Sequence, residues 1–309
     1  MAFSAAILGL AMILAVQPSA TSACFEDMGS VMLPDRHRVL GAISHGETGR
    51  AIAEAVLDGD AATVRRLAAA DPEALNAHVP PVEYPDFAPD GEFGDLLVFA
   101  VGRCDRAMLH TLLELGLSPD GAISGAALEL SIQANTPDFM IDLLDAGADP
   151  DPQKHGAAAY PLDRAAAHRN LAAARLLLRY GADVHWADPF GYTALHEAAA
   201  MDSIAVAELL IEHGADPWRP SRVGALPAWW IAQPLVLSHE ADVAARDRLI
   251  QRLRTSGAGW PPPDPQTVRR LALAGDWPGA ERRAAGVPDL PEGALDYLRE
   301  NYAPDGSAR

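Results

Sequence analysis

The stretch that decides the fold is residues 191–217, which read GYTALHEAAAMDSIAVAELLIEHGADP. Within it, residues 193–216 align at a shift of 33 with residues 160–183, which read YPLDRAAAHRNLAAARLLLRYGAD. Each copy contains two short apolar stretches joined by a turn, and GAD follows the second stretch in both. A repeat of this length predicts a stack of helix pairs, in which each pair buries its apolar stripe against the next pair.

Weaker copies keep the same phase on both sides. Upstream, residues 143–149 read LLDAGAD and residues 112–118 read LLELGLS, and residues 50–76 contain two short amphipathic stretches. Downstream, residues 226–232 read LPAWWIA, and residues 241–254 supply a late second helix. About six units are therefore predicted over residues 49–258, with an insertion at residues 77–95.

This pattern resembles the ankyrin-repeat family, whose signature is T-P-L-H-x-A, a leucine-rich second helix and then G-A-D. The resemblance implies an all-α ankyrin-repeat solenoid that binds proteins through the fingers between units and through its concave face. It also implies that His196 ties its turn to the neighbouring backbone. Residues 259–309 are predicted to form a helical cap over the last hydrophobic face, because terminal units need a polar outer side.

The N-terminal residues predict export. Residues 5–16 are almost continuously apolar and are followed by Pro18 and small residues. This run is shorter than the roughly 20 residues that span a bilayer, and it fits a signal peptide over residues 1–23. The absence of Lys and Arg before it departs from the usual signal pattern. Residues 24–48 are then a lead segment, and the protein is expected to be periplasmic or secreted, without a membrane span.

Two cysteines, Cys24 and Cys104, are open to three interpretations. They form a disulfide in an oxidising compartment, Cys24 carries a lipid anchor, or both are unpaired thiols. We favour the disulfide. Residues 21–24 read TSAC, which only loosely resembles a lipoprotein box.

Composition limits the partner. The 309 residues carry 42 acidic and 24 basic side chains, a formal net charge of −18. This balance argues against nucleic-acid binding, which needs a basic face, and it suits a basic protein partner. Only Lys154 is a lysine, and this arginine bias is typical of GC-rich bacterial genomes. We expect the protein to be a monomer.

A search for chemistry finds no complete motif. His196 and Glu197 begin a zinc-protease pattern, but Ala200 stands where the second histidine is needed. No nucleophile elbow, phosphate loop or metal-ligand spacing occurs. The sequence therefore predicts a non-catalytic protein without a cofactor or a metal. The alternative is an enzyme, or an enzyme's regulatory subunit, with its site in the C-terminal region near His239, Glu240 and Asp242.

Candidate partner-binding residues gather in the fingers and in the insertion. They are aromatic or arginine side chains, the types that dominate interface hot spots. The candidates are Trp186, Phe190, Tyr192, Trp218, Arg219, Arg222 and Trp230, with Tyr84 and Phe87 in the insertion. The alternative is that the tryptophans pack the later units together.

The function expected from these observations is a non-catalytic protein-interaction scaffold in the bacterial cell envelope. One concrete version is an immunity protein that occludes a toxin delivered into the envelope. An envelope chaperone or a host-directed effector would share the fold and the export.

Overall fold

The computed structural model describes residues 36–79, 94–155, 160–234 and 240–308. The structure is 59% helix and 2% strand, which confirms the predicted all-α class. The predicted signal peptide, Cys24, Tyr84, Phe87 and His239 lie outside the described residues, as does most of the lead segment.

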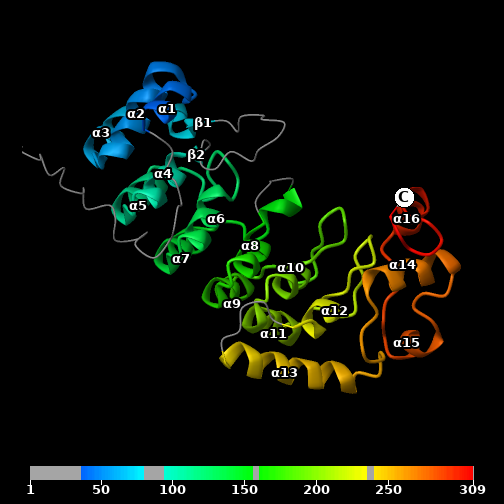
Figure 1. The fold of residues 1–309 in the computed structure, drawn as a ribbon. Helices are drawn as coiled ribbons and strands as arrows, with labels where there is room; N and C mark the ends of the chain where they lie inside the picture. Colours follow the sequence, from blue (N-terminus) through cyan, green and yellow to red (C-terminus); the bar gives the residue numbers. More distant parts are fainter. Residues whose placement is uncertain (1–35, 80–93, 156–159, 235–239, 309) are drawn as a thin grey trace, which may run out of the picture.

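Six successive helix pairs form the array, and they run diagonally across Figure 1 from blue to yellow. The pairs are α2 (Gly46–Asp58) with α3 (Ala61–Ala70), α4 (Leu96–Gly102) with α5 (Arg106–Glu114), α6 (Ala126–Gln133) with α7 (Pro137–Asp145), α8 (Pro161–Ala167) with α9 (Leu171–Arg179), α10 (Ala194–Ala200) with α11 (Ile204–Glu212), and α12 (Pro227–Ala232) with α13 (Glu240–Thr255).

Shorter elements flank and connect these pairs. α1 (Arg36–Ala42) precedes the array, and α14 (Pro265–Ala274), α15 (Ala280–Ala284) and α16 (Ala294–Asn301) follow it. The 3-10 helices are η1 (Pro72–Asn76) and η2 (Pro152–His155). β1 (His78–Val79) pairs antiparallel with β2 (Gly94–Asp95), so that the two ends of the predicted insertion meet.

The turn inside each of the first five pairs has one residue with a left-handed backbone. Gly59 has this conformation in the first pair, and in the next four pairs the positive φ angles lie between 49° and 56°. Those four residues are Cys104, Asn135, Arg169 and Asp202. The turn therefore has the same backbone geometry from unit to unit although its sequence varies.

Small residues let the first helices stack closely. Ala165 and Ala166 on α8 and Ala198 and Ala199 on α10 are at most 2% exposed. α8 contacts α10, and α10 contacts α12, in a continuous row. Long second-helix side chains such as Leu177, which is fully buried, fill the space behind this row. The core is thus one layer that is shared between neighbouring units.

Two loops between units contribute to the surface. We call them, by their residues, the 183–193 finger and the 216–226 finger. The backbone N–H of Arg222 donates to the carbonyl of Phe190 at 2.8 Å, which joins the two fingers. Turn hydrogen bonds close each finger, from Gly191 to Asp188 and from Gly224 to Ser221.

The cap formed by α14–α16 joins the array through these fingers. The Arg269 guanidinium on α14 donates to the carbonyl of Val223 at 3.0 Å. The Arg222 guanidinium donates to the carbonyl of Gly293 at 3.5 Å and lies over the Tyr297 ring of α16. Figure 1 accordingly shows α14 and α16 beside the loops of the last units.

One hexapeptide, TVRRLA, occurs at both ends of the molecule, at residues 63–68 in α3 and 267–272 in α14. In both places an aspartate three residues before the threonine caps the helix, Asp60 at 3.0 Å from the Thr63 nitrogen and Asp264 at 2.8 Å from the Thr267 nitrogen. The valine of each copy is fully buried. The same local signals therefore start a helix and orient it identically in two different surroundings.

Candidate interaction surface

His196, in the fourth position of its motif, holds its unit together by two hydrogen bonds. Its Nδ1 accepts from the backbone N–H of Thr193 at 3.1 Å. Its Nε2 lies 3.2 Å from the carbonyl of Ala225 in the 216–226 finger. Because Nδ1 accepts a hydrogen bond, it carries no proton, and Nε2 must carry the proton that it donates to the carbonyl, so the ring is neutral. Burial at 1% exposure lowers the pKa of His196 to about 4, which is consistent with that state.

Asp163 occupies the equivalent position one unit earlier, and its shorter side chain makes neither contact. The backbone N–H of Tyr160, which corresponds to that of Thr193, donates instead to Glu129 Oε1 at 2.8 Å. No hydrogen bond or ion pair reaches the Asp163 carboxylate within the part of the chain that the structure describes. Asp163 thus occupies the histidine position of the motif but does not make the hydrogen bonds that His196 makes there.

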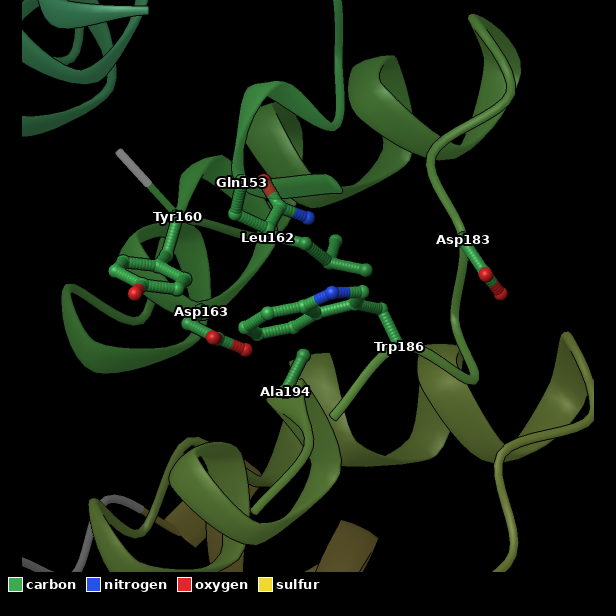
Figure 2. Close-up of a pocket in the computed structure, with 7 residues that line it drawn as sticks. All are labelled: Gln153, Tyr160, Leu162, Asp163, Asp183, Trp186 and Ala194. Atoms are coloured by element: carbon green, nitrogen blue, oxygen red, sulfur yellow. The ribbon is translucent and has the colours of Figure 1, made fainter. Parts of the chain in front are cut away.

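A small pocket opens beside Asp163, and we call it the Asp163 pocket. Its cavity volume is about 10 Å³, which is room for one water-sized group. Figure 2 shows the Trp186 indole between Leu162 and Ala194, with the Asp163 carboxylate and the Tyr160 ring at its edge. The Tyr160 and Trp186 ring centroids are 5.2 Å apart. Its lining residues are Gln153, Tyr160, Leu162, Asp163, Asp183, Trp186 and Ala194.

Comparison with known families assigns this region. A model of ankyrin repeats matches residues 128–221 and finds three copies there. Residues 128–221 are ankyrin repeats. The match runs from α6 into the 216–226 finger, so both His196 and Asp163 lie within recognised ankyrin repeats. No curated protein matches the chain. Ankyrin repeats are typically non-catalytic modules that bind other proteins, and they imply protein partners here.

The ankyrin array surrounds Asp163 with negative charge. Burial raises the pKa of Asp163 to about 7, and the nearby carboxylates of Glu197, Asp188 and Glu129 add to the effect. Burial also raises the pKa of Glu197 on α10. Arg164 is the cation that opposes these shifts, and its guanidinium lies 3.5 Å from Glu129. The surface between α8 and α10 therefore carries more negative charge than its own cation compensates.

The second carboxylate of the pocket is already paired. Lys154 places its ammonium nitrogen 3.0 Å from Asp183 and 3.2 Å from Asp151. Hydrogen bonds from His185 and Lys154 lower the pKa of Asp183. Asp183 is thus compensated from within the chain, whereas Asp163 is not.

The structure separates the predicted finger residues by exposure. Phe190 is 52% exposed and Tyr192 is 36% exposed, at the tip and the end of the 183–193 finger. Trp218 is only 5% exposed, which leaves little of its ring accessible to a partner. Trp186 is half-buried in the Asp163 pocket, and Trp230 is half-buried against Trp229 at a ring distance of 4.5 Å.

Both predicted arginines contact the protein itself. Arg219 donates to the carbonyl of His185 at 2.9 Å, and Arg222 donates to the carbonyl of Pro189 at 3.0 Å. Each guanidinium therefore joins the 216–226 finger to the preceding finger. The role of Arg219, Arg222 and the aromatic candidates in binding a partner stays a prediction.

Cys104 lies in the left-handed turn between α4 and α5 and is disulfide-bonded. The only other cysteine of the sequence, Cys24, lies outside the described residues. The pairing of Cys24 with Cys104 stays a prediction.

Within residues 36–79, 94–155, 160–234 and 240–308, no group of three or more His, Cys, Asp or Glu side chains is arranged to hold a metal ion. No helix among these residues has both the length and the apolar character needed to cross a bilayer.

Sequence reasoning missed Asp163 because it searched for matches to the repeat. The available signal was a mismatch: aligning YPLD with TALH places an aspartate where the motif has histidine. In a repeat protein, a residue that departs from the motif does not make the structural contacts that the motif residue makes. Such a residue is therefore a candidate for a function of its own.

Proposed function

We propose that this protein is an exported, non-catalytic ankyrin scaffold of the bacterial cell envelope that binds a partner protein. Its binding surface comprises α8, α10 and the 183–193 finger. The observation that carries the proposal is the character of this surface, where Phe190 and Tyr192 are exposed. Their backbone N–H groups donate to the carboxylate of Asp188, which belongs to the negative charge around Asp163. Exposed rings next to charges are typical of interface hot spots.

Charge supports a basic partner. The chain has a formal net charge of −18, and the carboxylates around Asp163 concentrate part of that charge on the binding surface. Such a surface accelerates association with a positively charged protein, most strongly at low ionic strength.

Two observations support export. The apolar stretch at residues 5–16 has the length of a signal-peptide core. Disulfides such as that of Cys104 persist in oxidising compartments, of which the periplasm is one. An immunity protein that occludes an envelope toxin is the version of the proposal that combines export, acidity and binding.

The test is cross-linked affinity capture from the native cell envelope, using the chain from Cys24 onward as bait. We expect one abundant basic protein to be recovered, and we expect recovery to fall steeply as salt increases. The double variant Phe190→Ala with Glu197→Gln removes a ring and a charge from the binding surface and should abolish capture without loss of helical content.

The matched control is Met201→Ala with Glu212→Gln. Met201 is 48% exposed at the end of α10, and Glu212 is exposed at the end of α11. This control should retain capture. Equal recovery by both double variants would contradict the proposed surface, and recovery of no partner by the unmodified bait would contradict the scaffold itself.

A further inference from the structure

The Asp163 pocket exists because an aspartate replaces the motif's histidine. In the next unit the His196 ring fills the corresponding space and bridges Thr193 to Ala225. The aspartate side chain is too short to make this bridge, so the space beside Trp186 and Ala194 remains open. The pocket therefore lies beside the position where the motif would place an imidazole, and Ala194 of the next repeat bounds it.

Among the described residues, no cation forms an ion pair with the carboxylate in this pocket, and the nearby Arg164 only partly offsets its charge. Partial burial of an unpaired carboxylate costs free energy, which a cationic ligand recovers by pairing with it. Asp183, on the other side of the pocket, is satisfied by Lys154 and does not compete for such a ligand. Glu129, Asp188 and Glu197 repel anions from the same surface.

The aromatic lining points to the same class of ligand. Trp186 and Tyr160 present ring edges and faces next to the carboxylate (Figure 2). Aromatic rings attract cations through their quadrupoles, and tryptophan does so most strongly. The pocket's cavity volume of about 10 Å³ admits one water-sized group, such as an ammonium, and nothing larger.

We propose that the Asp163 pocket binds the cationic end of a lysine or arginine side chain that a partner polypeptide inserts between α8 and the 183–193 finger. The ammonium or guanidinium group pairs with Asp163 and contacts the Trp186 and Tyr160 rings. Its small volume favours the ammonium group of lysine. This inference rests on the proposed scaffold function and specifies the chemistry of its contact.

The direct test uses two cationic probes, Nα-acetyl-lysinamide and Nα-acetyl-argininamide, and the neutral Nα-acetyl-norleucinamide. Each is titrated into the ¹⁵N-labelled protein while the indole N–H signals are followed, with Trp186 assigned by Trp186→Phe. We expect a saturable shift of the Trp186 signal with the cationic probes and not with the neutral one. No shift, or an equal shift with the neutral probe, would overturn the proposal.

Two variants separate charge from space. Asp163→Asn keeps the volume and removes the charge, and it should weaken binding of the lysine probe by about tenfold or more, as loss of a hydrogen bond to a charged group does. Asp163→His restores the motif and fills the pocket, so it should abolish the shift while keeping or raising the thermal midpoint of unfolding. Unchanged affinity in Asp163→Asn would overturn the proposal, and this variant decides the question if Asp163→His does not fold.

The matched control is Asp138→Asn on α7, whose side chain is 70% exposed on the second-helix side of the array. It makes the same change in net charge and should leave the titration unchanged. Partner capture then separates the two proposals. If Asp163→Asn captures the partner as well as the unmodified protein does, the pocket is wrong and the scaffold stands; if the unmodified protein captures nothing, the scaffold fails while the probe titration still decides the pocket.

Discussion

Asp163 and His196 occupy the same motif position in adjacent units and respond to pH in opposite directions. Burial raises the pKa of Asp163 to about 7 and lowers the pKa of His196 to about 4. Both shifts favour the neutral side chain, because each environment disfavours charge. The same motif position therefore affects the pH dependence of the unfolding free energy in opposite directions in two neighbouring repeats.

The first prediction concerns pH and Asp163→Asn. The folded pKa of Asp163 lies above the ordinary value of 3.8, so the stability that its proton provides is present near pH 4 and is lost as pH rises towards 7. The loss amounts to up to about 4 kcal/mol. The folded pKa of His196 lies below the ordinary value of 6.5, so its contribution is lost as pH falls from 6.5 towards 4.

These two contributions oppose each other between pH 4 and 7. Asp163→Asn removes one of them, so the unfolding free energy of the variant should rise relative to that of the unmodified protein over this range and exceed it at pH 7. Urea titrations at several pH values measure the difference, with Asp138→Asn as the charge-matched control. A difference that is the same at pH 4 and at pH 7 would show that Asp163 titrates normally.

The second prediction concerns the His196 bridge. His196→Ala leaves a cavity, unpairs the Thr193 N–H and removes one of the two donors to the Ala225 carbonyl, which still accepts from the Ser221 N–H. It should cost about 3 kcal/mol of unfolding free energy. The comparison is His185→Ala, an exposed side chain in the 183–193 finger, where about 0.5 kcal/mol or less is expected. Equal midpoints in urea for the two variants would refute a structural role for His196.

At the scale of elements, the repeat period predicted most of the array and little of its periphery. The pairs α8–α9 and α10–α11 could be predicted because their buried positions recur with a fixed spacing. That spacing follows from the period of each helix and from the stacking of one pair on the next. The pairing of β1 with β2 could not be predicted, because two-residue strands carry no periodic signal. The exposure of individual aromatic rings could not be predicted either. The repeat spacing places Trp218 in a finger but does not show which residues cover it.

The third prediction uses the duplicated TVRRLA helix, where equivalent arginines have different partners. Arg269 donates to the carbonyls of Gly306 and Val223 and lies 4.5 Å from the Tyr302 ring centroid. Arg65 forms an exposed ion pair with Glu114 at 2.8 Å. Arg269→Ala should therefore cost about 2 kcal/mol, whereas Arg65→Ala should cost about 0.5 kcal/mol or less.

Hydrogen exchange locates the effect of these arginine variants. Arg269→Ala should speed exchange at residues 221–225 of the 216–226 finger and in α14, and it should leave α4–α7 unchanged. Faster exchange throughout the array would mean that the cap contributes to global stability and is not a local attachment to the fingers.

At the scale of the molecule, contacts between neighbours dominate, and some links reach further. The cap, which the sequence predicted as a cover for the last hydrophobic face, is attached to the fingers by arginine contacts to loop carbonyls. Arg169, in the turn between α8 and α9, forms an ion pair with Asp242 on α13 at 2.6 Å. Cys104 also forms a disulfide. Long-range links of this kind have no sequence periodicity, so the sequence could name their residues and not their geometry.

The fourth prediction concerns that disulfide. If Cys104 pairs with Cys24, peptide mapping without reduction should recover one cross-linked peptide that contains both residues. Cys104→Ser should cost about 2–5 kcal/mol, the range seen when small secreted domains lose a native disulfide. A lipid-modified Cys24, detected by intact mass, would contradict the pairing and replace it with membrane attachment.

The ion pairs of Lys154 have a practical consequence for handling the protein. It is the chain's only lysine, and its amine is held between Asp151 and Asp183 at the edge of the Asp163 pocket. An amine-reactive dye therefore has one side-chain target, and a lysine-specific protease has one cleavage site, between the third and fourth helix pairs. A fluorophore at Lys154 would report from the rim of the pocket, and partner binding would be read as protection of that single amine.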